Sequence, residues 1–279
     1  MKFGLFGIGS GPCAKPEIAR AVAQAAESAG YDSLWTGEHV VLPDPQAPPS
    51  PAPPEAPMLH PSTILAYLAG VTKTIKLGTG IVLIAQRNPL VLAKEIASLD
   101  VVTEGRLIFG IGAGYLKAEF DALGVEFSER GARTDEYIEV LRNLWQSDNP
   151  EFTGKFTKFS AIQSRPRPAR AGGPPLVVGG ASPAALRRAV EKCHGWYGFA
   201  LDLDSTATCI AGLQEAAGKY ERPADLGELE ISVTPRHRLA PEQVAQYEEA
   251  GVSRLILLQP GSTQEELIDY LNSTAEQLM

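Results

Sequence analysis

Eight short apolar segments with strand composition recur along the chain, and segments with helical spacing lie between most of them. Strands that alternate with helices in this way favour a parallel sheet, because a helix is the usual crossover between parallel neighbours. Eight such strands in about 250 residues are typical of a (β/α)8 TIM barrel, and an open doubly wound sheet is the alternative. The predicted strands are residues 2–8, 31–36, 75–83, 107–111, 175–179, 195–199, 229–234 and 253–258.

Two irregular segments lie inside this repeat, so the sequence shows no domain boundary and we expect one domain over residues 1–279. Residues 43–61 hold nine of the chain's 22 prolines and cannot form a regular helix or a central strand. This segment follows a strand end, so it is either a lid over a pocket or a solvated insertion. Residues 151–169 alternate aromatic and polar side chains around Gly154, which predicts a small hairpin.

Composition and charge narrow the class of protein. A hydrophobic share of 44% with 21% charged residues is typical of a globular protein, and a formal charge of −8 argues against nucleic acid or an anionic membrane as the main partner. The chain contains no uncharged run of about 18 apolar residues and no basic start followed by a long apolar stretch, so we expect neither a membrane span nor export. Three cysteines without paired spacing favour reduced thiols in a cytoplasmic protein, and we predict no metal site.

Glycines mark both ends of the βαβ unit at residues 75–115. Gly78 and Gly80 lie inside its first strand, which indicates a bulge, a bend or a ligand lying against the backbone. The second strand runs into Gly112-Ala113-Gly114, whose backbone amides are left uncovered. This loop therefore suits a phosphate or a planar ring.

A second loop of the same kind, Gly179-Gly180-Ala181-Ser182, lies between a predicted strand and a helix. Free amides at a helix start suit an anion, so the two loops together favour a shared phosphate site. Ser182 as a simple helix cap explains the second loop equally well. Three arginines at 130, 133 and 142 either contact an anionic ligand or form a salt-bridged helix face.

Glu38 and His39 directly follow the second predicted strand, at the end of the sheet where α/β folds bind ligands. His39 can exchange a proton near neutral pH, and Glu38 can orient it or act as a base. The alternative is that both residues only hydrogen-bond neighbouring loops. His60, at the end of the proline-rich segment, fits the entry of a helix better than a ligand role.

Four segments together resemble the luciferase-like monooxygenase superfamily: GYDSLWTGEH, IKLGTGIVLIAQRNPLVLAKEIASLDVVTEGRLIFGIGAGY, ERGARTDEYIEVLRNLW and PPLVVGGASPAALRRA. The match covers nearly the whole chain in order. The chain is most similar to the branch that uses the deazaflavin coenzyme F420, where an acidic residue and a histidine follow the second strand. The resemblance implies a barrel enzyme, commonly a homodimer, that transfers a hydride between F420 and a small organic substrate.

The resemblance also implies which residues form the site. Relatives hold the ring against a bulge in the third strand, often with a non-prolyl cis peptide, which falls at Gly80-Ile81 here. His39, with Glu38, matches the position next to the reactive carbon of the ring. The implied phosphate contacts are Gly112, Ala113, Gly114 and Tyr115, together with Gly179, Gly180, Ala181 and Ser182.

The sequence is compatible with three functions. The chain has no strong basic cluster for a polyglutamate tail, so an FMN-dependent monooxygenase with a separate reductase is an alternative to an F420-dependent oxidoreductase. A non-catalytic flavin or deazaflavin carrier is the third. The identity of the substrate cannot be predicted from these residues.

Overall fold

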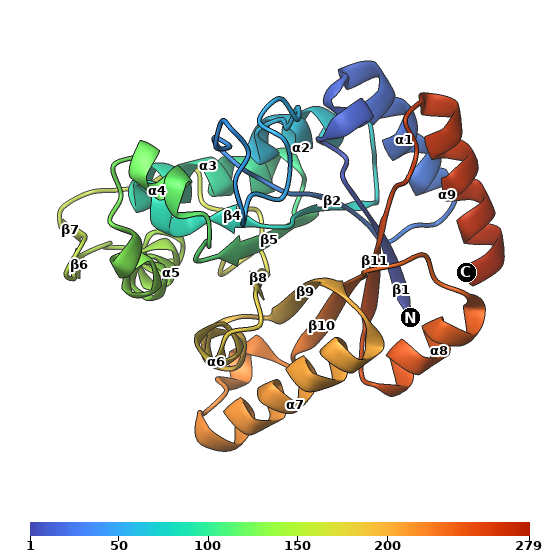
Figure 1. The fold of residues 1–279 in the computed structure, drawn as a ribbon. Coiled ribbons are helices and arrows are strands. Elements are labelled where there is room, and N and C mark those ends of the chain that lie inside the picture. Colours follow the sequence, from blue (N-terminus) through green and yellow to red (C-terminus); the bar gives the residue numbers. More distant parts are fainter.

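Eight parallel strands close into a barrel in the computed structural model, which describes residues 1–279 (Figure 1). The strands lie in the order β3, β2, β1, β11, β10, β9, β8, β5, and a further pairing of β5 with β3 closes the ring. The predicted (β/α)8 barrel is therefore confirmed, and the sheet is not open. The barrel strands are β1 (Lys2–Phe6), β2 (Ser33–Thr36), β3 (Lys76–Thr79), β5 (Leu107–Gly112), β8 (Leu176–Gly179), β9 (Gly195–Leu201), β10 (Glu230–Pro235) and β11 (Arg254–Leu258).

These strands are continuous apolar runs because one face of each strand packs into the barrel interior and the other packs against the helices. All six residues of β5 and all four of β2 are buried. Alternate side chains of each strand face inward, and one buried cluster fills the barrel interior with Trp35, Ile108, Val177, Tyr197 and Ile256. The larger cluster of 47 buried residues lies between the barrel and the helices.

The third barrel strand is interrupted, as its glycines predicted. β3 ends at Thr79, and β4 (Val82–Leu83) continues along β5 after Gly80 and Ile81. The peptide bond between Gly80 and Ile81 is cis, which is the feature that the family resemblance implied at this position. The break places Ile81 at the carboxyl end of the barrel.

We expect Gly78→Ala to destabilise the protein by about 1 to 3 kcal/mol. A Cβ at this position would lie 2.6 Å from two ring atoms of Trp35, whose side chain is fully buried and has no room to move. Urea unfolding followed by circular dichroism measures the change. Gly218→Ala is the control, because its added Cβ meets nothing within 4 Å and alanine favours the helix. Equal midpoints for the two variants would contradict this account of the packing.

Nine helices lie around the barrel (Figure 1). Five of them begin with proline in the first turn, where the missing N–H leaves no hydrogen bond unmade. The Asn88 side chain accepts the amides of Leu90 and Val91 and so caps one of these helices. The helices are α1 (Pro16–Ser28), α2 (Pro61–Ala69), α3 (Pro89–Val102), α4 (Lys117–Ala122), α5 (Arg130–Gln146), α6 (Pro183–Lys192), α7 (Leu203–Lys219), α8 (Pro241–Glu249) and α9 (Gln264–Leu278).

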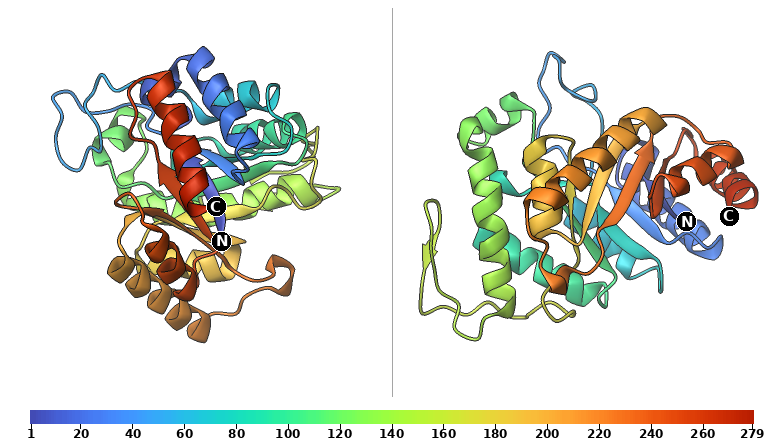
Figure 2. Two further views of the ribbon diagram at one scale, coloured as in Figure 1. Left: turned by 90° about the vertical axis from the view of Figure 1, so that its right-hand side faces the viewer. Right: turned by 90° about the horizontal axis from the view of Figure 1, so that it is seen from below.

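The two predicted insertions project from the barrel (Figure 2). β6 (Phe152–Thr153) and β7 (Lys158–Phe159) form the predicted antiparallel hairpin. Residues 43–61 form an irregular loop that returns to the β1–α1 connection, where Gly11 donates to the Pro57 carbonyl at 3.1 Å and Leu59 donates to the Gly9 carbonyl at 2.8 Å. These bonds hold the second half of the loop beside the carboxyl ends of the strands.

Candidate functional site

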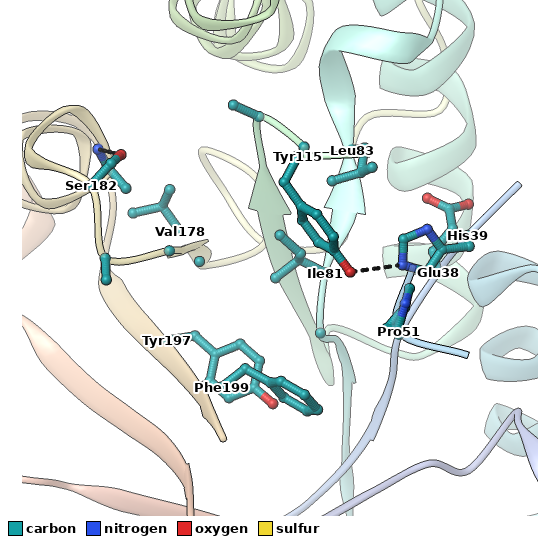
Figure 3. Close-up of a pocket in the computed structure, with 18 of the residues that line it drawn as sticks. Glu38, His39, Pro51, Ile81, Leu83, Tyr115, Val178, Ser182, Tyr197 and Phe199 are labelled. Atoms are coloured by element: carbon teal, nitrogen blue, oxygen red, sulfur yellow. Dashed lines mark hydrogen bonds between the residues drawn. The ribbon is translucent and has the colours of Figure 1, made fainter. Parts of the chain in front are cut away.

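A cavity of about 660 Å³ opens at the carboxyl end of the barrel (Figure 3). Its volume suits a cofactor-sized ligand, and this end is where barrel enzymes carry their sites. The loops after the first five barrel strands and the β9 strand itself contribute to it. The predicted site residues that line it are Glu38, His39, Gly80, Ile81, Ala113, Gly114, Tyr115, Gly179, Gly180, Ala181 and Ser182.

Gly112 is the predicted contact that does not line the cavity. It lies behind Ile81, and a Cβ at Gly112 would come within 2.0 Å of the Ile81 Cδ1 atom. A Cβ at Gly179 would also crowd the Ile81 side chain, at 3.2 Å. Gly112 therefore makes room for Ile81, which in turn faces the middle of the cavity (Figure 3).

His39 lies between two hydrogen-bonding partners. Its Nδ1 atom is 3.3 Å from Oε2 of Glu119, and its Nε2 atom is 3.4 Å from the Tyr115 hydroxyl (Figure 3). The His39 and Tyr115 rings meet edge to face with centroids 5.9 Å apart. The three residues come from the β2 loop, the β5 loop and α4, so the fold brings together groups that are distant in the sequence.

The charge state of Glu119 determines which tautomer a neutral His39 ring adopts. The Glu119 side chain is fully buried, and burial opposes its ionisation, but hydrogen bonds from His39 and from the Val40 amide outweigh this and lower its pKa. An ionised carboxylate only accepts hydrogen bonds, so the proton of a neutral His39 lies on Nδ1. Nε2 then accepts from the Tyr115 hydroxyl, whose pKa is raised by burial and by the Glu119 charge.

Glu38 faces a different group of side chains. Its carboxylate pairs with Arg87 and lies 3.6 Å from the His60 Nε2 atom, and its side chain is only 3% exposed. The orienting contact that the sequence assigned to Glu38 therefore comes from Glu119. His60 is the N-cap residue of α2, as predicted, and it also contacts Arg87 at 3.1 Å.

Sequence reasoning missed Glu119. Its neighbours Lys117 and Asp121 form an exposed ion pair, so the short helix has the sequence pattern of a solvated surface. The available signal was position: an acidic residue closely follows the glycine loop of β5, at the same end of the barrel as His39.

Two arginines lie at the glycine loops. Arg188 on α6 is 5% exposed and lines the cavity, and its Nε and Nη2 atoms donate to Asp135 at 2.8 and 3.0 Å. Arg130 also lines the cavity, donates from Nε to the Gly114 carbonyl at 3.1 Å and lies over the Phe127 ring. The structure thus adds a guanidinium group to each predicted phosphate loop.

The other candidate residues from the sequence, Ser182, Arg133 and Arg142, all make hydrogen bonds within the protein. Ser182 caps α6 by accepting the Ala185 amide at 3.3 Å, as the helix-cap alternative predicted, and it also lines the cavity. Arg133 pairs with Glu129, and Arg142 donates to the Lys192 carbonyl. These two arginines therefore support the alternative prediction, in which they pair with neighbouring groups of the protein and do not contact a ligand.

Apolar side chains form another wall. The ring centroids of Phe6 and Phe199 are 5.0 Å apart, and Tyr197 belongs to the cluster that fills the barrel interior. Pro51 and Met58 of the proline-rich segment also line the cavity, so this segment forms part of the site wall and is not merely a solvated insertion. No charged side chain belongs to this apolar wall, which suits an uncharged organic molecule.

No group of three or more His, Cys, Asp or Glu residues is arranged to hold a metal ion. None of the helices combines the length and apolar character that a membrane crossing requires. The three cysteines are free and buried, and burial raises the pKa of the Cys13 thiol to about 11. This thiol is therefore protonated at neutral pH.

Comparisons with known proteins agree with this geometry. The model of the luciferase-like monooxygenase family matches residues 2–270. An uncharacterised protein of Mycobacterium tuberculosis is 26% identical over 268 residues, which cover 92% of this chain and 93% of that protein. The oxygenase component of the flavin-dependent trigonelline monooxygenase of Acinetobacter baylyi is 33% identical over 171 residues, 61% of this chain and 44% of that protein.

A solved structure shows the same fold over the whole chain. An F420-dependent secondary alcohol dehydrogenase, in complex with an F420-acetone adduct, superposes with a TM-score of 0.79 at 18% identity, covering 99% of this chain and 98% of that one. The family match spans almost every element of the barrel, and the cis bond lies where the resemblance implied it. The chain therefore belongs to the luciferase-like monooxygenase family.

Proposed function

We propose that this protein is an oxidoreductase that transfers a hydride between coenzyme F420 and a small organic substrate. The observation that carries the proposal is one cavity lined by all of the predicted ring, phosphate and proton-transfer residues except Gly112. The fold that this chain shares with an F420-dependent secondary alcohol dehydrogenase also supports the proposal.

The residues present fit a phosphate-bearing tricyclic cofactor. The chain has a net charge of −8, yet Arg130 and Arg188 both line this cavity beside the glycine loops. These arginines and the amides of residues 113–115 and 179–182 would hold the phosphate, while Gly80 and Ile81 would support the ring. When bound, a deazaflavin or flavin supplies the redox chemistry.

The protein's own task is then to position the substrate and move a proton. His39 holds its proton on Nδ1 against Glu119, and its Nε2 atom takes part in proton exchange at the cavity through its hydrogen bond to Tyr115. The wall of Phe6, Phe199 and Met58 excludes water and favours an uncharged substrate.

An FMN-dependent monooxygenase is the second candidate, because the flavin-dependent trigonelline monooxygenase shares 33% identity over part of its length. Both cofactors carry a phosphate and a tricyclic ring, and both fit the same residues. Titration of the purified protein with F420 and with FMN, followed by fluorescence, separates them. We expect F420 to bind more tightly, and tight FMN binding without F420 binding would reject the proposal.

Arg188→Met should weaken cofactor binding by about tenfold to a hundredfold, because a charge-assisted hydrogen bond contributes about 1.5 to 3 kcal/mol. Arg187→Met is the matched control. Arg187 also donates to Asp135, at 2.9 Å, but it does not line the cavity. Fluorescence titration measures both affinities. Equal losses in the two variants would show that the Asp135 contacts, and not a phosphate contact, set the affinity.

A further inference from the structure

Both ring nitrogens of His39 are already engaged by protein groups. Glu119 lies against Nδ1, and the Tyr115 hydroxyl lies against Nε2. The side chain of His39 is 11% exposed, whereas Tyr115 is 50% exposed and lines the cavity (Figure 3). A substrate that enters the cavity therefore meets the Tyr115 hydroxyl in front of the imidazole.

The loop after β5 fixes Tyr115 in this place. Gly114 has a φ of +87°, which favours glycine, and a Cβ there would lie 2.6 Å from the Phe120 ring. Arg130 also bonds the Gly114 carbonyl. The resemblance assigned Tyr115 to the phosphate, but its hydroxyl is bonded to His39, at the proton-transfer group.

We propose that Tyr115 is the catalytic residue that exchanges the proton with the substrate oxygen, and that His39 and Glu119 act behind it as positioning and proton-storing residues. The proposal rests on the proposed function. In alcohol oxidation, the substrate O–H bond breaks and its proton passes to the Tyr115 oxygen. At the same time the original Tyr115 proton passes to His39 Nε2, and Glu119 balances the charge of the imidazolium.

The electrons balance in the same step. The carbon of the alcohol loses a hydride and the carbon–oxygen bond becomes a carbonyl; a bound oxidised deazaflavin would supply the acceptor for the electron pair. Carbonyl reduction follows the reverse path, starting from a protonated His39 that donates through Nε2 to the Tyr115 oxygen. The tautomer that an ionised Glu119 imposes on His39 is the one required for the oxidative direction, because it leaves Nε2 free to accept the Tyr115 proton.

Tyr115→Phe tests the proposal, since it removes the hydroxyl and keeps the ring edge against His39. We expect F420 affinity to change by less than about twofold and turnover of a small secondary alcohol to fall by about 10²-fold to 10⁴-fold. Tyr220→Phe, at an exposed tyrosine remote from the cavity, is the control and should leave both unchanged. Retained turnover, or an equal loss of F420 affinity, would overturn the proposal.

NMR of the cofactor-free protein gives a second readout. With ¹⁵N-labelled histidine, the four histidines yield few signals, and His39→Ala assigns the relevant one. We expect the Nδ1–H tautomer in the wild type and in Tyr115→Phe, and a shift toward Nε2–H in Glu119→Gln, where the amide can donate to Nδ1. An unchanged tautomer in Glu119→Gln would contradict the positioning role. If the wild type binds no F420, the proposed function fails whatever this spectrum shows.

Discussion

Replacing His39 with alanine is expected to lower turnover by about 10²-fold to 10⁴-fold while F420 stays bound. The imidazole is the only group hydrogen-bonded to both the buried Glu119 carboxylate and the Tyr115 hydroxyl, so its loss removes the proton store behind the cavity. The wild type is first assayed with a panel of small secondary alcohols and ketones. The absorbance change of F420 in a single turnover of the best substrate then measures the variant.

A matched control is His237→Ala, because His237 is exposed in the β10–α8 loop and does not line the site cavity. Its turnover should equal that of the wild type. Unchanged turnover in His39→Ala would instead contradict the proton-transfer role. Bound F420 that reacts with no member of the panel would favour the carrier hypothesis.

Replacing Arg254 with methionine should lower the free energy of unfolding by about 3 kcal/mol. The Arg254 side chain is 1% exposed and forms ion pairs with two carboxylates. Asp32, just before β2, lies 2.9 Å away, and Glu230 begins β10. Methionine fills the space but leaves both carboxylates without their shared cation. Urea unfolding at pH 7 measures the loss. Lys219→Met, at an exposed ion pair with Glu215, is the control and should leave the unfolding midpoint nearly unchanged.

The same ion network predicts a pH dependence. Burial opposes ionisation of Asp32 and Glu230, but the Arg254 guanidinium and the nearby Lys76 and Lys2 outweigh it and hold both pKa values below 3.8 and 4.5, their ordinary values. Lowered carboxyl pKa values stabilise the fold above these ordinary values, and the stabilisation is lost as the pH falls through the folded-state values. The difference between wild type and Arg254→Met should therefore be largest at neutral pH and shrink below about pH 4. A difference that grows on acidification would contradict this assignment.

The barrel could be predicted because each strand is a short apolar run and each helix has its own start and stop signals. The predicted strand at 107–111 corresponds to β5 at Leu107–Gly112, and the interruption at Gly80 was expected from its place inside a strand. The hairpin at 151–169 also formed where aromatic and polar residues alternate. These features depend on local sequence, which is why the residues alone were informative.

The contacts inside the site could not be predicted in the same way, because they join residues far apart in the chain. Glu119 and His39 are 80 positions apart, and a buried carboxylate on a short helix has no local pattern that distinguishes it from a solvated one. The sequence predicted Gly112 as a ligand contact, but its lack of a side chain leaves space for the Ile81 side chain. Arg188 follows Arg187 in a helix that also carries Glu191 and Lys192, and only its contact with Asp135 of α5 shows that this charged residue is buried at the cavity.

The central claim is that one glycine-lined cavity holds the ring and the phosphate of a deazaflavin next to His39. A crystal structure of the protein with F420 tests it most directly. We predict the ring against Gly80 and Ile81, the phosphate between the loops of Gly114 and Ser182, and the reactive carbon facing the His39 side of the cavity. F420 bound elsewhere on the protein, or in this cavity with its phosphate at the apolar wall of Phe6 and Phe199, would contradict the claim.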